Sequence, residues 1–270
     1  MPTPNDRITA FRRLHESGCF VIPNPWDIGS ARVLAGLGYS ALATTSSGFA
    51  WTQGRADNHV TVDQVLAHLR AMTAAVDLPF NADFEGGFAV EPDAVAANVT
   101  AATTTGIAGL SIEDSTGDDA HPLFDFELAV DRVRAAREAI DASGTGVMLT
   151  GRSEGFVAGR PDLEATIRRL TAYAEVGAEC LFAPGLGSVD DIKAVVAAVA
   201  PLPVNVLVTS SFTTVAELEQ AGVRRISVGG ALARAAWGAF YEAATEIRTK
   251  GTFDRMGQPA PFKSMNDFFQ

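Results

Sequence analysis

The sequence has few cysteines, little positive charge and no long apolar run. Its 270 residues include two cysteines, Cys19 and Cys180. They lie far apart, each in an apolar stretch, so we expect two buried free thiols, as suits a reducing cytoplasm. No apolar stretch reaches the roughly 18 residues that a membrane span requires, and the N-terminus lacks a basic-then-apolar signal pattern. We therefore expect a soluble cytoplasmic protein with no membrane partner.

Positive charge is scarce throughout the chain. There are 21 Lys and Arg residues against 32 Asp and Glu, which gives a net charge of −11 at pH 7. Because nucleic-acid binding relies on basic patches, we do not expect nucleic acid as a partner. An anionic substrate would need local compensation from a metal ion, an arginine or backbone N–H groups. A hydrophobic content of 47% is ordinary for a globular protein.

Short apolar runs alternate with longer Ala-rich amphipathic stretches. Acids and prolines mark the helix starts, and glycines often separate a helix from the next run. The apolar runs are continuous, which is typical of parallel strands covered on both faces. The predicted strands are 20–22, 41–44, 80–82, 109–112, 146–150, 180–182, 204–206 and 225–228. The predicted helices are 7–17, capped by Asn5 or Asp6, 28–37, 62–76, 92–104, 126–142, 162–175, 189–199, 214–221 and 232–249.

This alternation predicts an α/β protein. Eight strand–helix units in this length best fit a closed (β/α)8 TIM-type barrel, here with a C-terminal helical extension. A doubly wound open sheet is the competing arrangement. No Pro/Ser-rich linker divides the chain, so we expect one domain over residues 1–270. The tail, residues 251–270, carries apolar side chains that need cover. We expect it to pack on a neighbouring subunit, although packing back on its own barrel is equally allowed.

Two carboxylates stand two residues apart where the third predicted strand ends. Asp83 and Glu85 follow an apolar run and precede Gly86 and Gly87. On an extended segment this spacing places both acids on one side. Two acids that share a small space repel each other unless a proton or a cation lies between them. A hard divalent cation is the simpler answer, and a polar strand end running into a Gly turn is the alternative.

Polar residues recur at the same end of the other predicted strands, where a barrel of this kind gathers its chemistry. They include Ser46, Ser47, Asp57, Glu113, Asp114, Arg152 and Asn205. A ring of acids with one arginine and a Ser-Gly turn is what a metal-bound dicarboxylate or oxo-acid site requires.

Each of these residues also has a purely structural interpretation. A Ser/Thr-rich loop is usually turn chemistry. An arginine after a strand more often pairs with an acid than binds a substrate, and Asp57 and Asp114 can cap helices. His59, His68 and His121 have no metal-ligand spacing, and we expect them at the surface.

Taken together, several segments resemble one known group of enzymes. The resemblance runs from residue 24 to residue 230 and is to the isocitrate lyase/phosphoenolpyruvate mutase superfamily. The segments that carry it are Asn24-Pro25-Trp26-Asp27, Ser47-Gly48-Phe49, Asp57, Asp83-x-Glu85-x-Gly87-Phe88, Ile112-Glu113-Asp114, Arg152 and Pro203-Val204-Asn205. Members of that superfamily are Mg²⁺-dependent enzymes that cleave or form C–C or P–C bonds next to a carboxylate, through an enolate.

The resemblance implies a role for each matching residue. Asp83 would bind Mg²⁺ directly, with Mn²⁺ as a substitute, and Glu85 and Glu113 would hold the metal's waters. The backbone N–H groups of Ser47, Gly48 and Phe49 would hold the substrate carboxylate and enolate oxygen. The catalytic set would be Ser47, Asp57, Glu113 and Arg152, with Arg152 also in the anion clamp and Asn205 contacting substrate at the mouth. We also expect a homo-oligomer, either a dimer or a tetramer.

Two departures from the superfamily pattern bear on the reaction. The second acid of the pair is usually Asp, and here it is Glu85. The loop 115–124 lacks the Cys and Lys residues of lyase members, so a proton donor to carbon is missing unless His121 folds over the site. We therefore expect a lyase or decarboxylase for a small 2-oxo or 2-hydroxy dicarboxylate, since decarboxylation demands least of this loop.

Three other functions stay open at this point. A P–C bond enzyme, a phosphonopyruvate hydrolase or phosphoenolpyruvate mutase, would rely on a Lys in the same loop. A sugar-phosphate enzyme would use the Gly-rich segment 227–232 as a phosphate cradle, although no Lys ends a strand to form a Schiff base. A non-catalytic relative would keep the metal and oxo-acid pocket without turnover.

Overall fold

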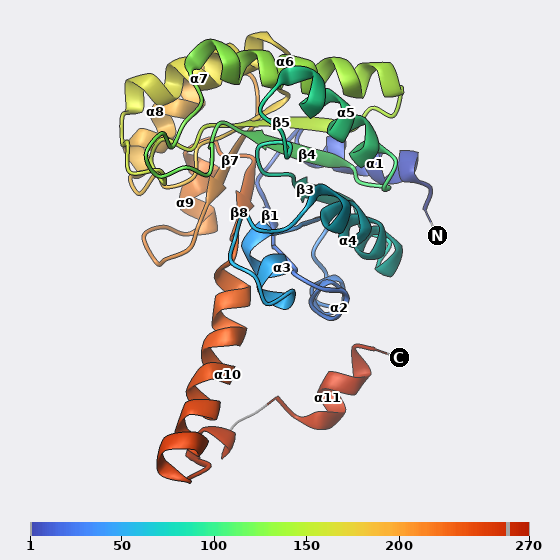
Figure 1. Cartoon of the computed structure of the whole chain (residues 1–270), viewed down its shortest axis with the longest axis vertical. Helices are drawn as coiled ribbons and strands as arrows, with labels where there is room; N and C mark the ends of the chain where they lie inside the picture. Colours follow the sequence, from blue (N-terminus) through green and yellow to red (C-terminus); the bar gives the residue numbers. More distant parts are fainter. Residues whose placement is uncertain (1, 258–259, 270) are drawn as a thin grey trace.

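The computed structural model describes residues 2–257 and 260–269. Eight parallel strands form one sheet in the order β1-β8-β7-β6-β5-β4-β3-β2 (Figure 1). At the two edges of this order, the Ala43 N–H donates to the Pro23 carbonyl over 3.1 Å, so the sheet is nearly closed. The predicted (β/α)8 barrel is confirmed, and the open-sheet alternative is excluded. The strands are β1 (Phe20–Ile22), β2 (Leu42–Ala43), β3 (Phe80–Asp83), β4 (Gly109–Glu113), β5 (Met148–Arg152), β6 (Cys180–Phe182), β7 (Val204–Leu207) and β8 (Arg225–Ser227).

Helices surround the barrel and extend beyond it. Two short helices escaped the sequence interpretation, α3 and α11, because each has fewer than two turns of periodic pattern. The helices are α1 (Pro4–Leu14), α2 (Ile28–Gly36), α3 (Ser46–Thr52), α4 (Val62–Ala75), α5 (Pro92–Thr103), α6 (Phe126–Ser143), α7 (Leu163–Glu175), α8 (Val189–Val199), α9 (Val215–Gln220), α10 (Ala231–Lys250) and α11 (Phe262–Asp267), with a short 3-10 turn at Asp254–Gly257.

Two boundaries differ from the predictions in an informative way. Helix α1 is capped by Thr3 rather than by Asn5 or Asp6, because the Thr3 side chain and Asp6 form a reciprocal capping box. Strand β5 spans Met148–Arg152 rather than 146–150. Arg152 is therefore part of the strand, and its backbone is held by the sheet register opposite Glu113.

Helix α1 closes the end of the barrel where the strands begin. Phe11 is fully buried, and its ring lies so close to the start of β4 that a Cβ on Gly109 would stand 2.7 Å from Phe11 Cε1. His15 packs edge-on against Phe20 at the start of β1. With this end plugged, a cavity in the barrel has to open at the opposite end, where the strands finish.

The C-terminal part of the chain leaves the barrel (Figure 1). Helix α10 projects away from it, and Trp237, Phe240 and Tyr241 on this helix are exposed. The tail then returns to its own chain, where a Cβ on Gly36 of α2 would stand 3.1 Å from Phe268 Cδ1. Of the two arrangements left open for residues 251–270, packing on the same chain is thus present at Phe268.

The structure also tests the predictions of two buried free thiols and of no membrane span. Cys180 is a buried free thiol as expected, but Cys19 is only half-buried and also free. In the part of the chain that the structure describes, every helix is too short or too polar to traverse a lipid bilayer.

Replacing Gly109 by alanine tests the plug at the barrel base. The new Cβ would lie 2.8 Å from Asn81 Oδ1 and 3.2 Å from the Met148 carbonyl, as well as against Phe11. We expect Gly109→Ala to lower the free energy of unfolding by about 1–3 kcal/mol, measured by urea denaturation. Gly238→Ala is the control, because its Cβ meets nothing within 4 Å and alanine favours a helix. Equal stability of the two variants would contradict this packing.

Candidate active site

A cavity of about 160 Å³ opens at the end of the barrel where the strands finish, and every strand contributes to its wall. Five of the predicted site residues line it: Ser47, Asp57, Asp83, Arg152 and Asn205. The cavity lies where the fold predicts a site. Glu85 and Glu113 line a second, adjoining cavity of about 460 Å³, so the predicted acids are divided between two neighbouring spaces.

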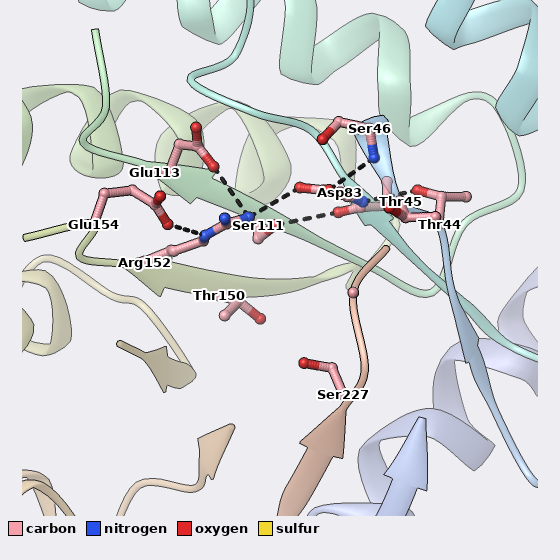
Figure 2. A network of polar contacts seen from close by, with 12 residues as sticks. Thr44, Thr45, Ser46, Asp83, Ser111, Glu113, Thr150, Arg152, Glu154 and Ser227 are labelled. Atoms are coloured by element: carbon pink, nitrogen blue, oxygen red, sulfur yellow. Dashed lines mark hydrogen bonds and ion pairs between the residues drawn. The ribbon is translucent and has the colours of Figure 1, made fainter. Parts of the chain in front are cut away.

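Arg152 lies among three carboxylates (Figure 2). Its Nη1 is 3.1 Å from Asp83 Oδ1 and 3.0 Å from Glu113 Oε2. Its Nε donates to Glu154 Oε1. Arg152 therefore pairs with acids in this structure, as the structural interpretation predicted. The acids that it contacts come from strand ends or from the loop directly after β5.

Asp83 is held from two sides. Its Oδ2 accepts a hydrogen bond from the Ser46 N–H over 2.9 Å, and its own N–H donates to Thr44 Oγ1 over 2.9 Å. Ser46 begins helix α3, where an unpaired N–H favours a carboxylate. The Ser/Thr-rich segment after β2 is thus more than turn chemistry, because it orients the acid at the end of the neighbouring strand.

Glu85 lies on an irregular loop that a buried arginine holds in place. Glu85 and Phe88 have positive φ angles of 47° and 57°, which are strained for residues other than glycine. Arg132 of α6 donates from Nη1 to the Ala89 and Val90 carbonyls over 2.8 and 3.0 Å, and from Nη2 to the Gly86 carbonyl. These bonds offset the strain and fix the chain on which Glu85 is carried.

The acids outnumber the cations in this region, and their pKa values reflect it. Burial, then the charges of Asp83 and Asp57, raise the pKa of Glu85 to about 8. Burial also raises the pKa of Glu113 well above its ordinary value, although Arg152 opposes the shift. Burial and Asp83 raise the pKa of Asp57. One arginine therefore does not neutralise the cluster.

This donor set suits a hard divalent cation. The available ligands are carboxylate oxygens, and Glu85 Oε1 is buried without a hydrogen-bond partner among the described residues. Over residues 2–257 and 260–269, no three His, Cys, Asp or Glu side chains converge closely enough to bind one metal ion directly. Mg²⁺ usually keeps several waters and takes only one or two carboxylates, so the residues present fit such an ion.

The expected roles of Gly48 and Phe49 need correction. Neither residue lines the cavity, and their N–H groups are bonded to Thr45 Oγ1 and the Thr45 carbonyl. A Cβ on Gly48 would stand 2.9 Å from the Cβ of Trp26, so this glycine permits close packing. The Phe49 ring stacks on His68 at 3.9 Å. His68 is therefore half-buried rather than at the surface, and burial lowers its pKa to about 4.

Asn205 contacts the cavity from inside the barrel rather than from its mouth. It is buried, and its Nδ2 donates to Ser227 Oγ over 2.9 Å. The end of β4 shows a second correction, since Asp114 caps none of the described helices. Asp114 accepts hydrogen bonds from the Glu154 N–H and the Tyr173 hydroxyl, each over 2.7 Å. It thereby orients Glu154, which stands two residues after Arg152 and which the sequence analysis did not assign to the site.

The loop that lacks Cys and Lys does not bring His121 to the cavity. Its side chain is 86% exposed and lies 3.5 Å from Asp118. The expectation that His121 replaces the missing acid therefore has no support in this arrangement of the loop.

The Gly-rich segment after β8 is engaged in packing. The N–H groups of Val228 and Gly229 donate to Asn24 Oδ1 over 2.9 and 2.8 Å. Asn24 Nδ2 in turn donates to the Thr44 carbonyl over 2.9 Å, so Asn24 joins β8 to β2 across the edge strand β1. Two of the N–H groups that a phosphate cradle would use are therefore engaged by Asn24, which weighs against the sugar-phosphate hypothesis.

Comparison with known proteins agrees with this geometry. The sequence matches the model of the phosphoenolpyruvate phosphomutase family over residues 11–248. The chain belongs to this family. A candidate lyase or mutase from Burkholderia cenocepacia J2315 superposes with a TM-score of 0.94 at 45% identity, covering 98% of this chain and 96% of that one. An uncharacterised protein of Mycobacterium tuberculosis is 30% identical over 258 residues, which is 95% of this chain and 94% of its own.

Family relatives with named activities are more distant or match in part. The 2-methylisocitrate lyase of Escherichia coli K12 is 33% identical over 153 residues, which is 54% of this chain and 50% of that enzyme. Two relatives are named oxaloacetate decarboxylase, at 31% identity over 144 residues in Bradyrhizobium diazoefficiens and 26% over 260 residues in Chromohalobacter salexigens. The phosphoenolpyruvate mutase/isocitrate lyase superfamily thus contains both lyases and mutases.

The raised pKa of Glu85 predicts how stability depends on pH in the metal-free protein. Glu85 keeps its proton in the folded state up to pH about 8, whereas the unfolded chain loses it near pH 4.5. The folded state therefore binds more protons across this window, and its stability falls as pH rises. Glu85→Gln removes the charge. We expect the free energy of unfolding of this variant at pH 9 to exceed that of wild type by on the order of 2 kcal/mol.

The measurement is urea denaturation in EDTA at pH 5 and pH 9. At pH 5 the variant and wild type should be nearly equal, because Glu85 is protonated in the fold. Glu138→Gln is the control, since Glu138 is exposed on α6 and should leave the pH dependence unchanged. A Glu85→Gln variant that loses stability with pH as steeply as wild type would refute the assignment.

Proposed function

We propose that this chain is a Mg²⁺-dependent lyase or decarboxylase that acts on a small 2-oxo or 2-hydroxy dicarboxylate. The supporting observation is the cluster of Asp83, Glu85 and Glu113 around Arg152, in which carboxyl groups outnumber cations and Glu85 Oε1 has no partner among the described residues. The names of the relatives, lyases and decarboxylases of small carboxylic acids, support the same reaction class.

In this proposal Asp83 holds the metal directly, and Glu85 and Glu113 hold it through water, with Mn²⁺ as a substitute. Bound there, the ion would act as a Lewis acid toward negative charge that develops on a substrate oxygen. Asp83 lines the central cavity, whereas both glutamates line the adjoining one. The three acids thus reach the region between the two cavities from both sides.

The chain's own residues supply positioning around that ion. Arg152 is held by three carboxylates, so its guanidinium has a fixed place and loses little freedom when a substrate arrives. Ser47 lines the cavity, and its hydroxyl lies 3.2 Å from Thr45 Oγ1. Asp57, whose pKa is raised, lines the same wall and is the acid that we assign to proton exchange with the substrate.

Within this reaction class we favour decarboxylation. Cleavage of a 2-hydroxy acid needs one group to remove the hydroxyl proton and another to return a proton to carbon. The loop 115–124 has neither Cys nor Lys, and His121 points to solvent. Loss of CO₂ from a 2-oxo diacid needs no base at the start, and water can return the proton afterwards. A P–C bond enzyme is less favoured for the same reason, because it would rely on the missing Lys.

A panel of substrates and metals tests the proposal. Oxaloacetate, methylisocitrate, dimethylmalate and phosphonopyruvate are incubated with Mg²⁺, Mn²⁺ or EDTA, and pyruvate release is followed against enzyme-free blanks. We expect turnover with one of the two C–C bond classes, abolished by EDTA. Asp83→Asn should lower kcat/KM at least about 100-fold, since a metal ligand contributes several kcal/mol to charge stabilisation.

Asp118→Asn serves as the matched control, because Asp118 is an exposed acid outside both cavities. Full activity of Asp83→Asn, or turnover in EDTA, would rule out the metal-dependent mechanism. Binding of a dicarboxylate without product under any metal would instead support the non-catalytic alternative.

We also propose that the chain forms a homo-oligomer, a dimer or a tetramer. Phe240 and Tyr241 on the projecting helix α10 are 64% and 70% exposed. Together with Trp51 and Trp237 they line an apolar groove. An apolar surface of this kind on a helix that leaves its own barrel is costly in water and marks an interaction site.

The mass in solution tests this proposal. Light scattering after gel filtration should give a multiple of the 28.3 kDa chain mass. The double variant Phe240→Ser, Tyr241→Ser should shift the protein toward the monomer, because it removes apolar area from the groove. Arg248→Ser, at an exposed position of the same helix, should leave the mass unchanged. A wild-type protein that elutes with the mass of one chain would contradict the proposal.

A further inference from the structure

A second arginine lies deeper in the same barrel. Arg225 is the first residue of β8 and is only 3% exposed, yet it lines the central cavity together with Asp83 and Arg152. Arg225 precedes Ser227 by two residues on β8, so the two side chains lie on the same face of the strand. The Ser227 side chain faces the barrel interior, opposite Thr150 (Figure 2). Arg225 therefore forms part of the cavity floor.

All the hydrogen-bond partners found for Arg225 are neutral. Its Nε donates to Asn205 Oδ1 and its Nη2 to Thr150 Oγ1, each over 3.0 Å. Its Nη1 lies 3.4 Å from His15 Nε2. Burial, then the charge of Arg225, lower the pKa of His15 to about 3, so this imidazole is uncharged near neutral pH and accepts the bond.

No carboxylate lies within ion-pair distance of Arg225 among residues 2–257 and 260–269. A guanidinium carries five N–H donors, and the three partners above leave part of that capacity unused. A buried charge without a counter-ion is costly. Burial accordingly lowers the pKa of Arg225 from its ordinary value, and only the Cys180 thiol, itself buried, opposes the shift.

The two arginines of the cavity thus differ in kind. Arg152 is bound to three carboxylates, and its charge is more than offset. Arg225 keeps a positive charge that nothing in the described chain neutralises. The cavity is therefore acidic at its mouth and positive at its floor, which suits a ligand whose anionic group points into the barrel.

We propose that Arg225 is the specificity residue of this cavity, and that it selects small dicarboxylates by attracting the second carboxylate toward the barrel floor. This inference rests on the proposed function, which places the reacting end of the substrate at the mouth of the cavity. It adds the reason for choosing a diacid over a monoacid. The volume of about 160 Å³ limits the ligand to a short carbon chain.

Two ligands of matched shape test the inference. Malate carries a second carboxylate, and 2-hydroxybutyrate carries a methyl group in its place. Calorimetric titration of the Mg²⁺-loaded full chain should show malate binding about tenfold or more tightly than 2-hydroxybutyrate, as expected for a charge-assisted contact. Arg225→Met should remove this preference and change the affinity for 2-hydroxybutyrate less than about threefold. Arg225→Lys should retain part of it.

Thr150→Val is the control variant, because it removes one neutral partner of Arg225 and leaves the guanidinium charge in place. It should keep the preference for malate. Equal binding of the two ligands by the wild-type protein would overturn the inference without any variant. The test therefore does not depend on whether Arg225→Met folds. Equal weakening of both ligands in Arg225→Met or Arg225→Lys, with the melting temperature maintained, would also overturn it and assign Arg225 a structural role.

The outcome is separable from that of the proposed reaction. Turnover with an unchanged preference for malate in Arg225→Met would leave the lyase proposal standing and reject the role of Arg225. A malate preference that depends on Arg225 in a protein without turnover would support the role of Arg225 and reject the lyase proposal.

Discussion

The site depends on one cation placed among more acids than it can neutralise. Arg152 contacts Asp83, Glu113 and Glu154, which come from three consecutive strands or the loop after the third. Breaking such a buried ion pair by removing one partner is costly, because the remaining charge loses its compensation. The cluster therefore fixes the relative positions of β3, β4 and β5 at the end where they line the cavity, and its carboxyl groups outnumber its single arginine.

The rest of the barrel supports this arrangement through close approaches and polar cross-links. Asn24 connects β8 and β2 across β1, and Gly48 lets the start of α3 lie against Trp26. The α3 N-terminus then presents the Ser46 N–H to Asp83. Arg132 performs the corresponding task for the loop of Glu85 from outside the barrel. The acids of the cluster are thus oriented by neighbours that do not themselves reach the cavity.

Charge is distributed unevenly along the depth of the cavity, and this distribution is consistent with the overall acidity of the chain. A protein of net charge −11 needs local positive charge to attract an anionic ligand, and long-range attraction from the surface is unfavourable. Arg225 supplies a buried positive charge in a region of low dielectric, where electrostatic interactions are stronger than in water. Under the proposed function, the choice among small acids therefore depends on the barrel floor as well as on the loops at its mouth.

Local pattern was enough to determine the fold of this protein. Continuous apolar runs between amphipathic stretches located all eight strands, seven of them within one residue at both ends, because burial on both faces leaves a clear signature. The acids Asp83 and Glu113 and the arginine at 152 were also recognisable, since strand ends of a parallel barrel meet at one edge. Their spacing along the chain indicated a shared site before any contact was known.

Only the tertiary structure decided which partner each side chain has. Period-two alternation tells on which face a residue lies, but not which residue stands opposite it across the barrel. For this reason the engagement of Arg152 by Glu154, the inward stacking of Phe49 on His68, and the use of the Gly229 N–H by Asn24 were not predictable from the sequence. Arg225 shows the same limit most clearly, because the lack of a carboxylate beside it in the described part of the chain is a property of eight strands brought together rather than of any one of them.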